Sequence, residues 1–195
     1  LRVRFTWSEG GLRVEKVYVF RRGSYEIDIE TTLTNEGAEP WQGAPYLQIR
    51  RHYRPQSRSF TNVDSISYRG PVVYDGRKYD KLKPKKLRRD RLDLEATGGW
   101  FAAIQHHFLG AIVPPPDQPW RYVATINDGD VYTLNAIAAN AFALPPGEST
   151  TLTQSTYVGP KLQDQLKEVS TRLPLAVDYG FFKLLAEPLF WVLDK

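Results

Sequence analysis

The N-terminal third of the chain alternates between apolar and polar positions with a period of two. In residues 24–35, SYEIDIETTLTN, one face carries tyrosine, isoleucine and leucine, while the other carries acidic residues and threonine. This alternation is typical of an antiparallel strand with one buried and one solvated face. The preceding residues 12–20, LRVEKVYVF, predict a second strand, joined to the first through a short hairpin connection at residues 21–23.

The same kind of pattern continues through most of the chain. Further strands are predicted at residues 45–53, 120–126, 130–138 and 149–159. Turn residues lie between them at Asn35-Glu36-Gly37, Asn127-Asp128-Gly129 and Pro145-Pro146-Gly147. Many strands separated by such turns, with little helical periodicity, predict a β-sandwich or a large twisted sheet. Residues 55–99 are the least regular part, and we interpret them as a long excursion with one strand near residues 71–74.

Helical periodicity appears only near the C-terminus. Pro160 follows Gly159 and is a favourable first residue for a helix, and Pro174 follows the last periodic residue. The apolar residues between them lie on one helical stripe: Leu162, Leu166, Val169 and Leu173. We therefore predict a helix over residues 160–174 that packs on the sandwich.

The final stretch, FFKLLAEPLFWVLDK, is apolar except for one narrow polar stripe. Asp178 can cap a second helix, Lys183 and Glu187 lie one turn apart, and Pro188 predicts a kink or a break. The stretch is too short to span a bilayer. Its apolar face is also wider than packing on one face of a sandwich would require. Two interpretations remain open on this pattern: a terminal helix docked on the core or in a dimer, and a helix lying at a membrane surface.

Composition places the chain among folded globular proteins. It has 195 residues, 42% of them hydrophobic and 25% charged, which excludes disorder throughout and allows a substantial core. It has no cysteine, so it can form neither a disulfide nor a thiolate metal site. The sequence begins at Leu1 inside a strand-like pattern and has no methionine, which leads us to expect a piece of a longer protein.

The net charge of +4 comes from one segment. Residues 77–91 hold nine Lys and Arg residues against two Asp, so the rest of the chain is slightly acidic. A solvated loop is one interpretation; nucleic-acid binding is disfavoured because no nucleic-acid fold accompanies the segment. The third is attraction to anionic lipid headgroups or to an acidic partner. That contact would be made by Lys83, Lys85, Lys86, Arg88 and Arg89.

Three stretches together resemble one known family in their order and spacing. They are TGGWFAAIQHHFLGAIVP at residues 97–114, YVGPKLQDQL at 157–166 and VDYGFFKLLAEPLFWVL at 177–193. Each is a modest signal, but jointly they resemble the large periplasmic domain of YidC, the bacterial inner-membrane protein insertase. Residues 16–37 also look like that family's early hairpin, whereas residues 55–96 depart most from it.

The resemblance implies a mostly β protein, an antiparallel β-supersandwich similar to galactose mutarotase with two C-terminal α-helices. Residues 1–159 would form the sandwich without its N-terminal part, and residues 160–174 the helix packed on it. Residues 175–195 would form an interfacial amphipathic helix leading to a transmembrane segment that the sequence lacks. The residues implied to meet the membrane are Phe181, Phe182, Leu185, Leu189, Phe190 and Trp191.

The resemblance also implies a function in contact rather than catalysis, at the periplasmic face of the bacterial inner membrane. The implied partners are the Sec translocon (SecYEG), SecD–SecF, client membrane proteins and the membrane surface, and not nucleic acid. Insertion would be assisted with and without the translocon. The family's membrane-embedded insertion machinery is not in this sequence, so the chain is not expected to insert proteins alone.

A mutarotase-like sandwich raises one alternative, a sugar-binding or aldose epimerase-like domain. Epimerisation needs a general acid and a general base, usually His with Glu. His106 and His107 are adjacent in a predicted strand, so they should point to opposite faces and could not both line one pocket. His52 lies in another predicted strand, and no His or carboxylate cluster has the spacing of metal ligands. We therefore expect no catalysis, no metal site and no cofactor.

The aromatic residues leave a further question open. Trp7, Trp41, Trp100 and Trp120, with the many tyrosines, could line a carbohydrate or peptide cleft, or could fill the sandwich core.

Overall fold

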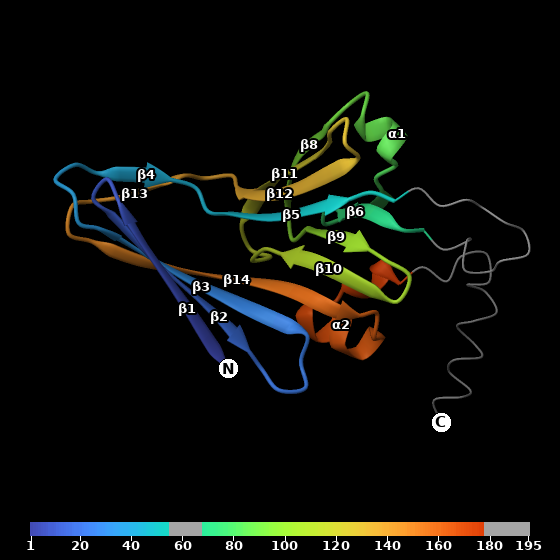
Figure 1. The fold of residues 1–195 in the computed structure, drawn as a ribbon, viewed down its shortest axis with the longest axis horizontal. Coiled ribbons are helices and arrows are strands. Elements are labelled where there is room, and N and C mark those ends of the chain that lie inside the picture. The colour runs from blue at the N-terminus through green and yellow to red at the C-terminus, as the bar shows by residue number, and fades with distance from the viewer. Residues whose placement is uncertain (55–67, 178–195) are drawn as a thin grey trace, which may run out of the picture.

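The part of the chain that the structure describes folds mostly into antiparallel strands (Figure 1). The computed structural model describes residues 1–54 and 68–177. The strands are β1 (Arg2–Glu9), β2 (Leu12–Phe20), β3 (Glu26–Asn35), β4 (Trp41–Gly43), β5 (Tyr46–His52), β6 (Gly70–Tyr74), β7 (Tyr79–Lys81), β8 (Leu92–Thr97), β9 (Trp100–Ile104), β10 (Phe108–Val113), β11 (Pro119–Ile126), β12 (Val131–Ala138), β13 (Phe142–Leu144) and β14 (Ser149–Pro160). The helices are α1 (Pro84–Leu87), α2 (Gln163–Val169) and the 3₁₀ helix η2 (Leu173–Ala176).

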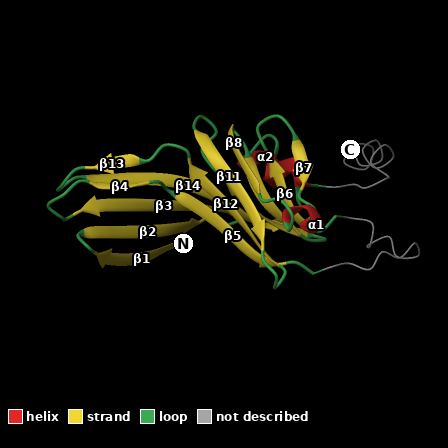
Figure 2. Cartoon of the chain, turned by 90° about the horizontal axis from the view of Figure 1, so that it is seen from above, coloured by secondary structure: helices red, strands yellow, loops and turns green. Residues whose placement is uncertain are grey.

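Eight strands form one large sheet in the order β1-β2-β3-β14-β10-β9-β6-β7. The long strand β14 joins the two halves of this sheet. Along one edge its residues 149–157 pair with β3, and along the other edge its residues 155–160 pair with β10. The two halves therefore form one continuous twisted surface, visible along its length in Figure 2.

A four-stranded sheet, β5-β12-β11-β8, packs on one face of the β10-β9-β6 half (Figure 1). Phe101 of β9 and Tyr122 of β11 meet edge to face, with ring centroids 5.2 Å apart. Ala103, Leu134 and Ala136 are buried in the same core. Alternating residues of the two facing sheets thus supply a sandwich core.

The opposite face of the same half is covered by α2 and η2. Every residue of β6 and β9 is buried, because one face of each strand meets the small sheet and the other meets these helices. Trp100 is fully buried on the helical side, with its ring centroid 5.8 Å from that of Tyr74 and 5.9 Å from that of Tyr79.

The β1-β2-β3 half extends beyond the small sheet and is covered at its far end by the short β4–β13 pair (Figure 2). The buried Asn35 fixes this region. Its side-chain NH₂ group donates to the carbonyls of Glu39 and Leu144, each at 2.8 Å, and its Oδ1 accepts from the Gly37 N–H at 3.0 Å. This buried polar side chain is therefore hydrogen-bonded at both ends of its amide, as burial requires.

The fold class predicted from the sequence is confirmed: the chain is mostly antiparallel β with little helix. Each strand predicted at residues 12–20, 45–53, 120–126, 130–138 and 149–159 is present with small shifts at its ends. The tryptophans differ in how deeply they are buried. Trp100 and Trp120 are buried in the core and Trp41 is half-buried, whereas Trp7 is 51% exposed on β1.

The interpretation of residues 55–99 is corrected for its described part. Beyond the expected strand near residues 71–74, this region contributes β7, β8 and the helix α1. The one-turn α1 also corrects the prediction that helix occurs only near the C-terminus. Pro84 starts this turn, and Leu87 is buried against the sandwich while the lysines between them face outward. A single turn carries too little periodicity to be recognised in sequence.

The helix predicted over residues 160–174 is shorter than expected. Pro160 is the last residue of β14, and α2 spans only Gln163–Val169 before a turn leads into η2. Leu166 and Leu173 are fully buried as predicted, but Leu162 precedes the helix and is 49% exposed. A second helix over residues 175–195 cannot be compared, because residues 178–195 lie outside the described part of the chain.

Candidate functional site

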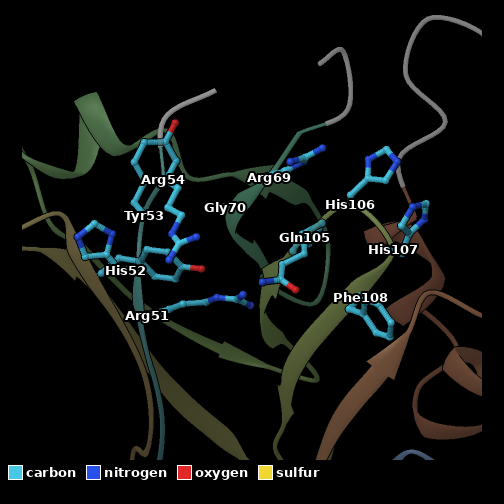
Figure 3. A pocket seen from close by; sticks show the side chains of 12 residues that line it. Arg51, His52, Tyr53, Arg54, Arg69, Gly70, Gln105, His106, His107 and Phe108 are labelled. Carbon is cyan, nitrogen blue, oxygen red and sulfur yellow. The ribbon is translucent and has the colours of Figure 1, made fainter. Parts of the chain in front are cut away.

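A pocket of about 610 Å³ opens at one end of the molecule, between the end of β5, the start of β6 and the turn that joins β9 to β10 (Figure 3). Its walls come from four segments that are far apart in the sequence, the fourth being β12, which contributes Tyr132. The residues lining it are Arg51, His52, Tyr53, Arg54, Arg69, Gly70, Ile104, Gln105, His106, His107, Phe108 and Tyr132.

Backbone pairing fixes these walls. Arg51 pairs with Tyr132 across the β5–β12 ladder, and the Tyr53 N–H continues this edge by donating to the carbonyl of Asp130 at 2.7 Å. On the opposite side Gly70 pairs with Ile104 across the β6–β9 ladder. Gly70 adopts a φ of +149°, which favours glycine, and an added Cβ would lie 2.8 Å from the Tyr68 hydroxyl.

The three histidines of the chain all line this pocket, which corrects the prediction that His106 and His107 could not share one. Both lie in the turn between β9 and β10, which the Gln105 N–H closes by donating to the Phe108 carbonyl at 2.8 Å. Their rings stand edge to face with centroids 4.0 Å apart. The strict alternation of side chains holds within a strand and does not extend through a tight turn.

The pocket is strongly basic. Three arginines line it, and none of its described lining residues is an Asp or Glu. Burial raises the pKa of Tyr132, on the wall, to about 12, while the positive charge of Arg51 opposes this rise. The guanidinium of Arg51 therefore lies close enough to the Tyr132 hydroxyl to act on it.

This set of side chains suits ligand binding better than acid–base catalysis of sugar epimerisation. All three histidines line the pocket, but the carboxylate that would pair with them is not among the described residues of the pocket wall. Within residues 1–54 and 68–177, no group of three or more His, Asp or Glu is arranged to hold a metal ion.

The basic residues singled out from the sequence lie around α1. Lys83, Lys85, Lys86, Arg88 and Arg89 are all exposed. They divide into two groups. Arg88 forms an ion pair with Asp130, and Arg89 lies 3.8 Å from the carboxylate of Asp90. The three lysines form no ion pair with any residue in the described part of the chain.

Asp130 connects this basic helix to the pocket. Its carboxylate pairs with Arg88, and its carbonyl accepts the hydrogen bond from Tyr53, which lines the pocket. In Figure 1, α1 lies at the same end of the molecule as the end of β5 and the start of β6, the segments that carry the pocket arginines. The lysines can be recognised in the sequence from their clustering, whereas the pocket arginines cannot, because positions 51, 54 and 69 are scattered along the chain.

The residues expected at the membrane interface lie outside the described residues: Phe181, Phe182, Leu185, Leu189, Phe190 and Trp191. In the described part of the chain, no helix is long and apolar enough to cross a membrane. The position and contacts of the terminal stretch therefore stay a prediction.

The Val-Gly-Pro-Lys stretch at residues 158–161 has a structural role beside the pocket. A Cβ added to Gly159 would lie 2.4 Å from the ring of Tyr25, so only glycine fits there without movement. Two residues on, the Lys161 N–H donates to the carbonyl of His107 at 2.9 Å. The end of β14 thus holds the histidine turn in place.

Comparison with known proteins gives a consistent result over the whole chain. The family model for the YidC periplasmic domain matches residues 1–192. A protein of Alkalilimnicola ehrlichii named Membrane protein insertase YidC is 36% identical over 100% of this chain and 35% of its own length. A protein of the same name from Thioalkalivibrio sulfidiphilus is 38% identical, again over 100% of this chain and 35% of its own. The chain therefore spans about one third of the length of these relatives.

Among solved structures, a galactose mutarotase related enzyme from Lactobacillus acidophilus has a similar fold. Its TM-score is 0.51 at 10% sequence identity, over 80% of this chain and 67% of that one. At this identity the likeness concerns the fold alone, and it supports the predicted galactose mutarotase-like architecture.

Proposed function

Because the chain belongs to the YidC periplasmic domain family, we propose that it acts as the periplasmic contact domain of a membrane protein insertase. In this role it meets the membrane surface and partner proteins at the periplasmic face of the inner membrane, and it performs no catalysis itself. The observation that carries the proposal is the match of the family model to residues 1–192, supported by relatives that are named as insertases.

The partners follow from the same proposal. We infer that the domain contacts client membrane proteins, with and without the Sec translocon (SecYEG), and that SecD–SecF binds it as part of the translocon assembly. A mostly β domain of this size offers wide solvated sheet surfaces for such contacts. One such surface is the edge formed by β1, which pairs only with β2 among the described strands, together with the exposed side chains Phe5 and Trp7.

The membrane contact is assigned to the terminal apolar residues. Bulky aromatic side chains with a thin charged stripe are typical of helices that lie in the bilayer interface. The chain has no cysteine, so one fluorophore can be placed by a single substitution, Phe190→Cys, with Val158→Cys on β14 as a control at a 59% exposed site.

Labelled at position 190, the 195-residue chain should show a blue-shifted emission and quenching by lipid-attached quenchers when vesicles are added. Labelled at position 158, it should show neither effect. Equal quenching at both positions, or none at position 190, would remove the membrane-surface role of the terminal stretch. Family membership would be unaffected by that result.

The lysines of α1 supply a second, electrostatic contribution in this proposal. A basic residue close to an anionic bilayer contributes on the order of 1 kcal/mol to binding. Replacing Lys83, Lys85 and Lys86 by Gln should therefore weaken binding to phosphatidylglycerol-containing vesicles by about tenfold or more. The matched control replaces three exposed arginines elsewhere, Arg13, Arg22 and Arg50, and has the same net charge. If both triple variants lose the same affinity, α1 has no special role and only net charge matters.

A further inference from the structure

The basic pocket contains more positive charge than the fold requires. Arg51 is the last residue but one of β5, Arg54 follows this strand, and Arg69 immediately precedes β6. These arginines belong neither to the core between the two sheets nor to the core beneath α2 and η2, which are built from other residues. Like charges gathered around one cavity repel one another, so an arrangement of this kind is unfavourable unless an anion is bound there.

Two of these arginines form no ion pair with an acidic residue in the described part of the chain, so their charge is not balanced there. Within residues 1–54 and 68–177, neither Arg51 nor Arg54 forms an ion pair, whereas Arg2, Arg4, Arg21, Arg88 and Arg121 each do. Asp130, in the adjoining loop, is paired with Arg88. The guanidinium groups of Arg51 and Arg54 are therefore available to a ligand.

Two side chains from opposite walls of the pocket also point toward each other. In Figure 3, Arg51 extends from β5 across the pocket toward Gln105, which points back from the end of β9. His106 and His107 stand above Gln105 on the same wall, opposite His52 and Tyr53. Side chains from both walls thus bring guanidinium, amide, imidazole and phenol groups to one cavity.

The donor set identifies the chemistry of the ligand. Each guanidinium presents N–H groups in a planar fork that matches the oxygens of phosphate, and such bonds are stronger than those between neutral groups. Arg51 and Arg54 together offer more N–H donors than the two oxygens of a carboxylate can accept, and the additional oxygens of a phosphate group accept more of them. A pocket of about 610 Å³ is also large enough for a phosphate that carries a small organic group.

We propose that this pocket is a binding site for a phosphate group, held by Arg51 and Arg54 with Arg69 and Gln105 completing the wall. The phosphate can belong to the headgroup of an anionic phospholipid or to a small soluble phosphate. The proposal does not rest on the contact function proposed above, because it concerns residues that the terminal stretch and α1 do not include.

The test uses the 195-residue chain and two kinds of probe. Inorganic phosphate and glycerol 1-phosphate are titrated by calorimetry. Vesicles of phosphatidylglycerol are tested by flotation, against vesicles of phosphatidylcholine. The decisive variant is Arg51→Gln, and the matched control is Arg50→Gln. These two residues are neighbours on β5, but adjacent strand residues point to opposite faces, and Arg50 does not line the pocket.

We expect saturable binding that Arg51→Gln weakens at least tenfold and that Arg50→Gln leaves within twofold of the parent. If glycerol 1-phosphate and inorganic phosphate bind, the source is soluble phosphate. If only phosphatidylglycerol vesicles bind, with the same loss in Arg51→Gln, the source is a lipid headgroup. Either result supports the phosphate site.

The site is overturned if no probe binds, or if Arg50→Gln weakens binding as much as Arg51→Gln does. Circular dichroism melting establishes that each variant is folded. Should Arg51→Gln fail to fold, Arg54→Gln decides in its place, because Arg54 follows β5 and pairs with no strand. Retention of full affinity in Arg54→Gln then counts against the proposal.

Discussion

At the scale of single residues, burial controls the ionisation of three tyrosines. Tyr68, Tyr122 and Tyr132 each have a pKa raised chiefly by burial, which disfavours the charged phenolate. Tyr68 is also affected by neighbouring tyrosines, including Tyr53 and Tyr79. Tyr132 lines the basic pocket, whereas the Tyr122 ring packs against Phe101 in the sandwich core.

The raised pKa of Tyr132 gives a pH-dependent stability. A free tyrosine ionises near pH 10, whereas burial raises the pKa of Tyr132 to about 12. The unfolded chain therefore loses this proton first as the pH rises. The stabilisation from neutral, buried Tyr132 is complete below about pH 10 and is lost between about pH 10 and 12.

We expect the free energy of unfolding to fall less steeply over this range in Tyr132→Phe than in the parent. Spectrophotometric titration of Tyr132→Phe at alkaline pH should also show one fewer tyrosine that ionises above pH 10 than titration of the parent. Tyr46→Phe is the control, since Tyr46 is 61% exposed on the same sheet. A Tyr132→Phe chain with the titration curve of Tyr46→Phe would contradict the assignment.

Gly159 provides a second test at the scale of one residue. In Gly159→Ala the new Cβ would lie 2.4 Å from the Tyr25 ring, so the ring or β14 must move. Overpacking of this kind costs about 1–3 kcal/mol in the free energy of unfolding. Gly110→Ala on the neighbouring strand β10 is the control, because nothing lies within 4 Å of its added Cβ. Chemical denaturation should separate the two; similar stabilities would show that Tyr25 does not occupy this space.

At the scale of elements, the sequence predicted strands well and short helices poorly. Alternation identified β2, β3, β5, β11, β12 and β14, because each has one buried face and one wetter face. The helix α1 was missed because one turn has no periodicity, and β7 is too short to show alternation. The helix α2 was overestimated because Leu162 and Leu173 fit the helical spacing while lying outside the helix.

The candidate site shows the same limit. The lysines near α1 can be recognised because they lie close together in the sequence. The pocket cannot be predicted in this way, because its walls are brought together by strand pairings between residues far apart in the sequence. The pairing of Gly70 with Ile104 is one example. Strand alternation predicts opposite faces for His106 and His107. This prediction is wrong because both residues lie in the turn between β9 and β10.

The role of α2 can be tested by comparing two of its leucines. Leu166 is fully buried between α2 and the large sheet, whereas Leu162 precedes the helix and is 49% exposed. We expect Leu166→Ala to lower the free energy of unfolding by about 2–5 kcal/mol. Leu162→Ala should change it by less than about 0.5 kcal/mol. Equal effects in urea denaturation would mean that α2 does not pack on the sheet as described.

The whole molecule has a basic end and a more neutral remainder. The pocket arginines and the α1 lysines lie at the same end, joined through the loop that holds Asp130 (Figure 1). A domain with this distribution of charge should meet an anionic surface end-on. Its attraction to such a surface should weaken with salt, because the Debye length falls from about 10 Å at 0.1 M to about 3 Å at 1 M.

Flotation with vesicles tests the central claim, that the domain contacts the membrane surface through its terminal apolar residues. The chain of residues 1–195 is compared with a chain ending at residue 177, using phosphatidylglycerol-containing vesicles at 0.1 M and 1 M salt. We predict that the full chain floats at both salt concentrations, and that the shorter chain floats only at low salt and weakly. If the shorter chain floats as well as the full chain at 1 M salt, the terminal residues do not provide the membrane contact.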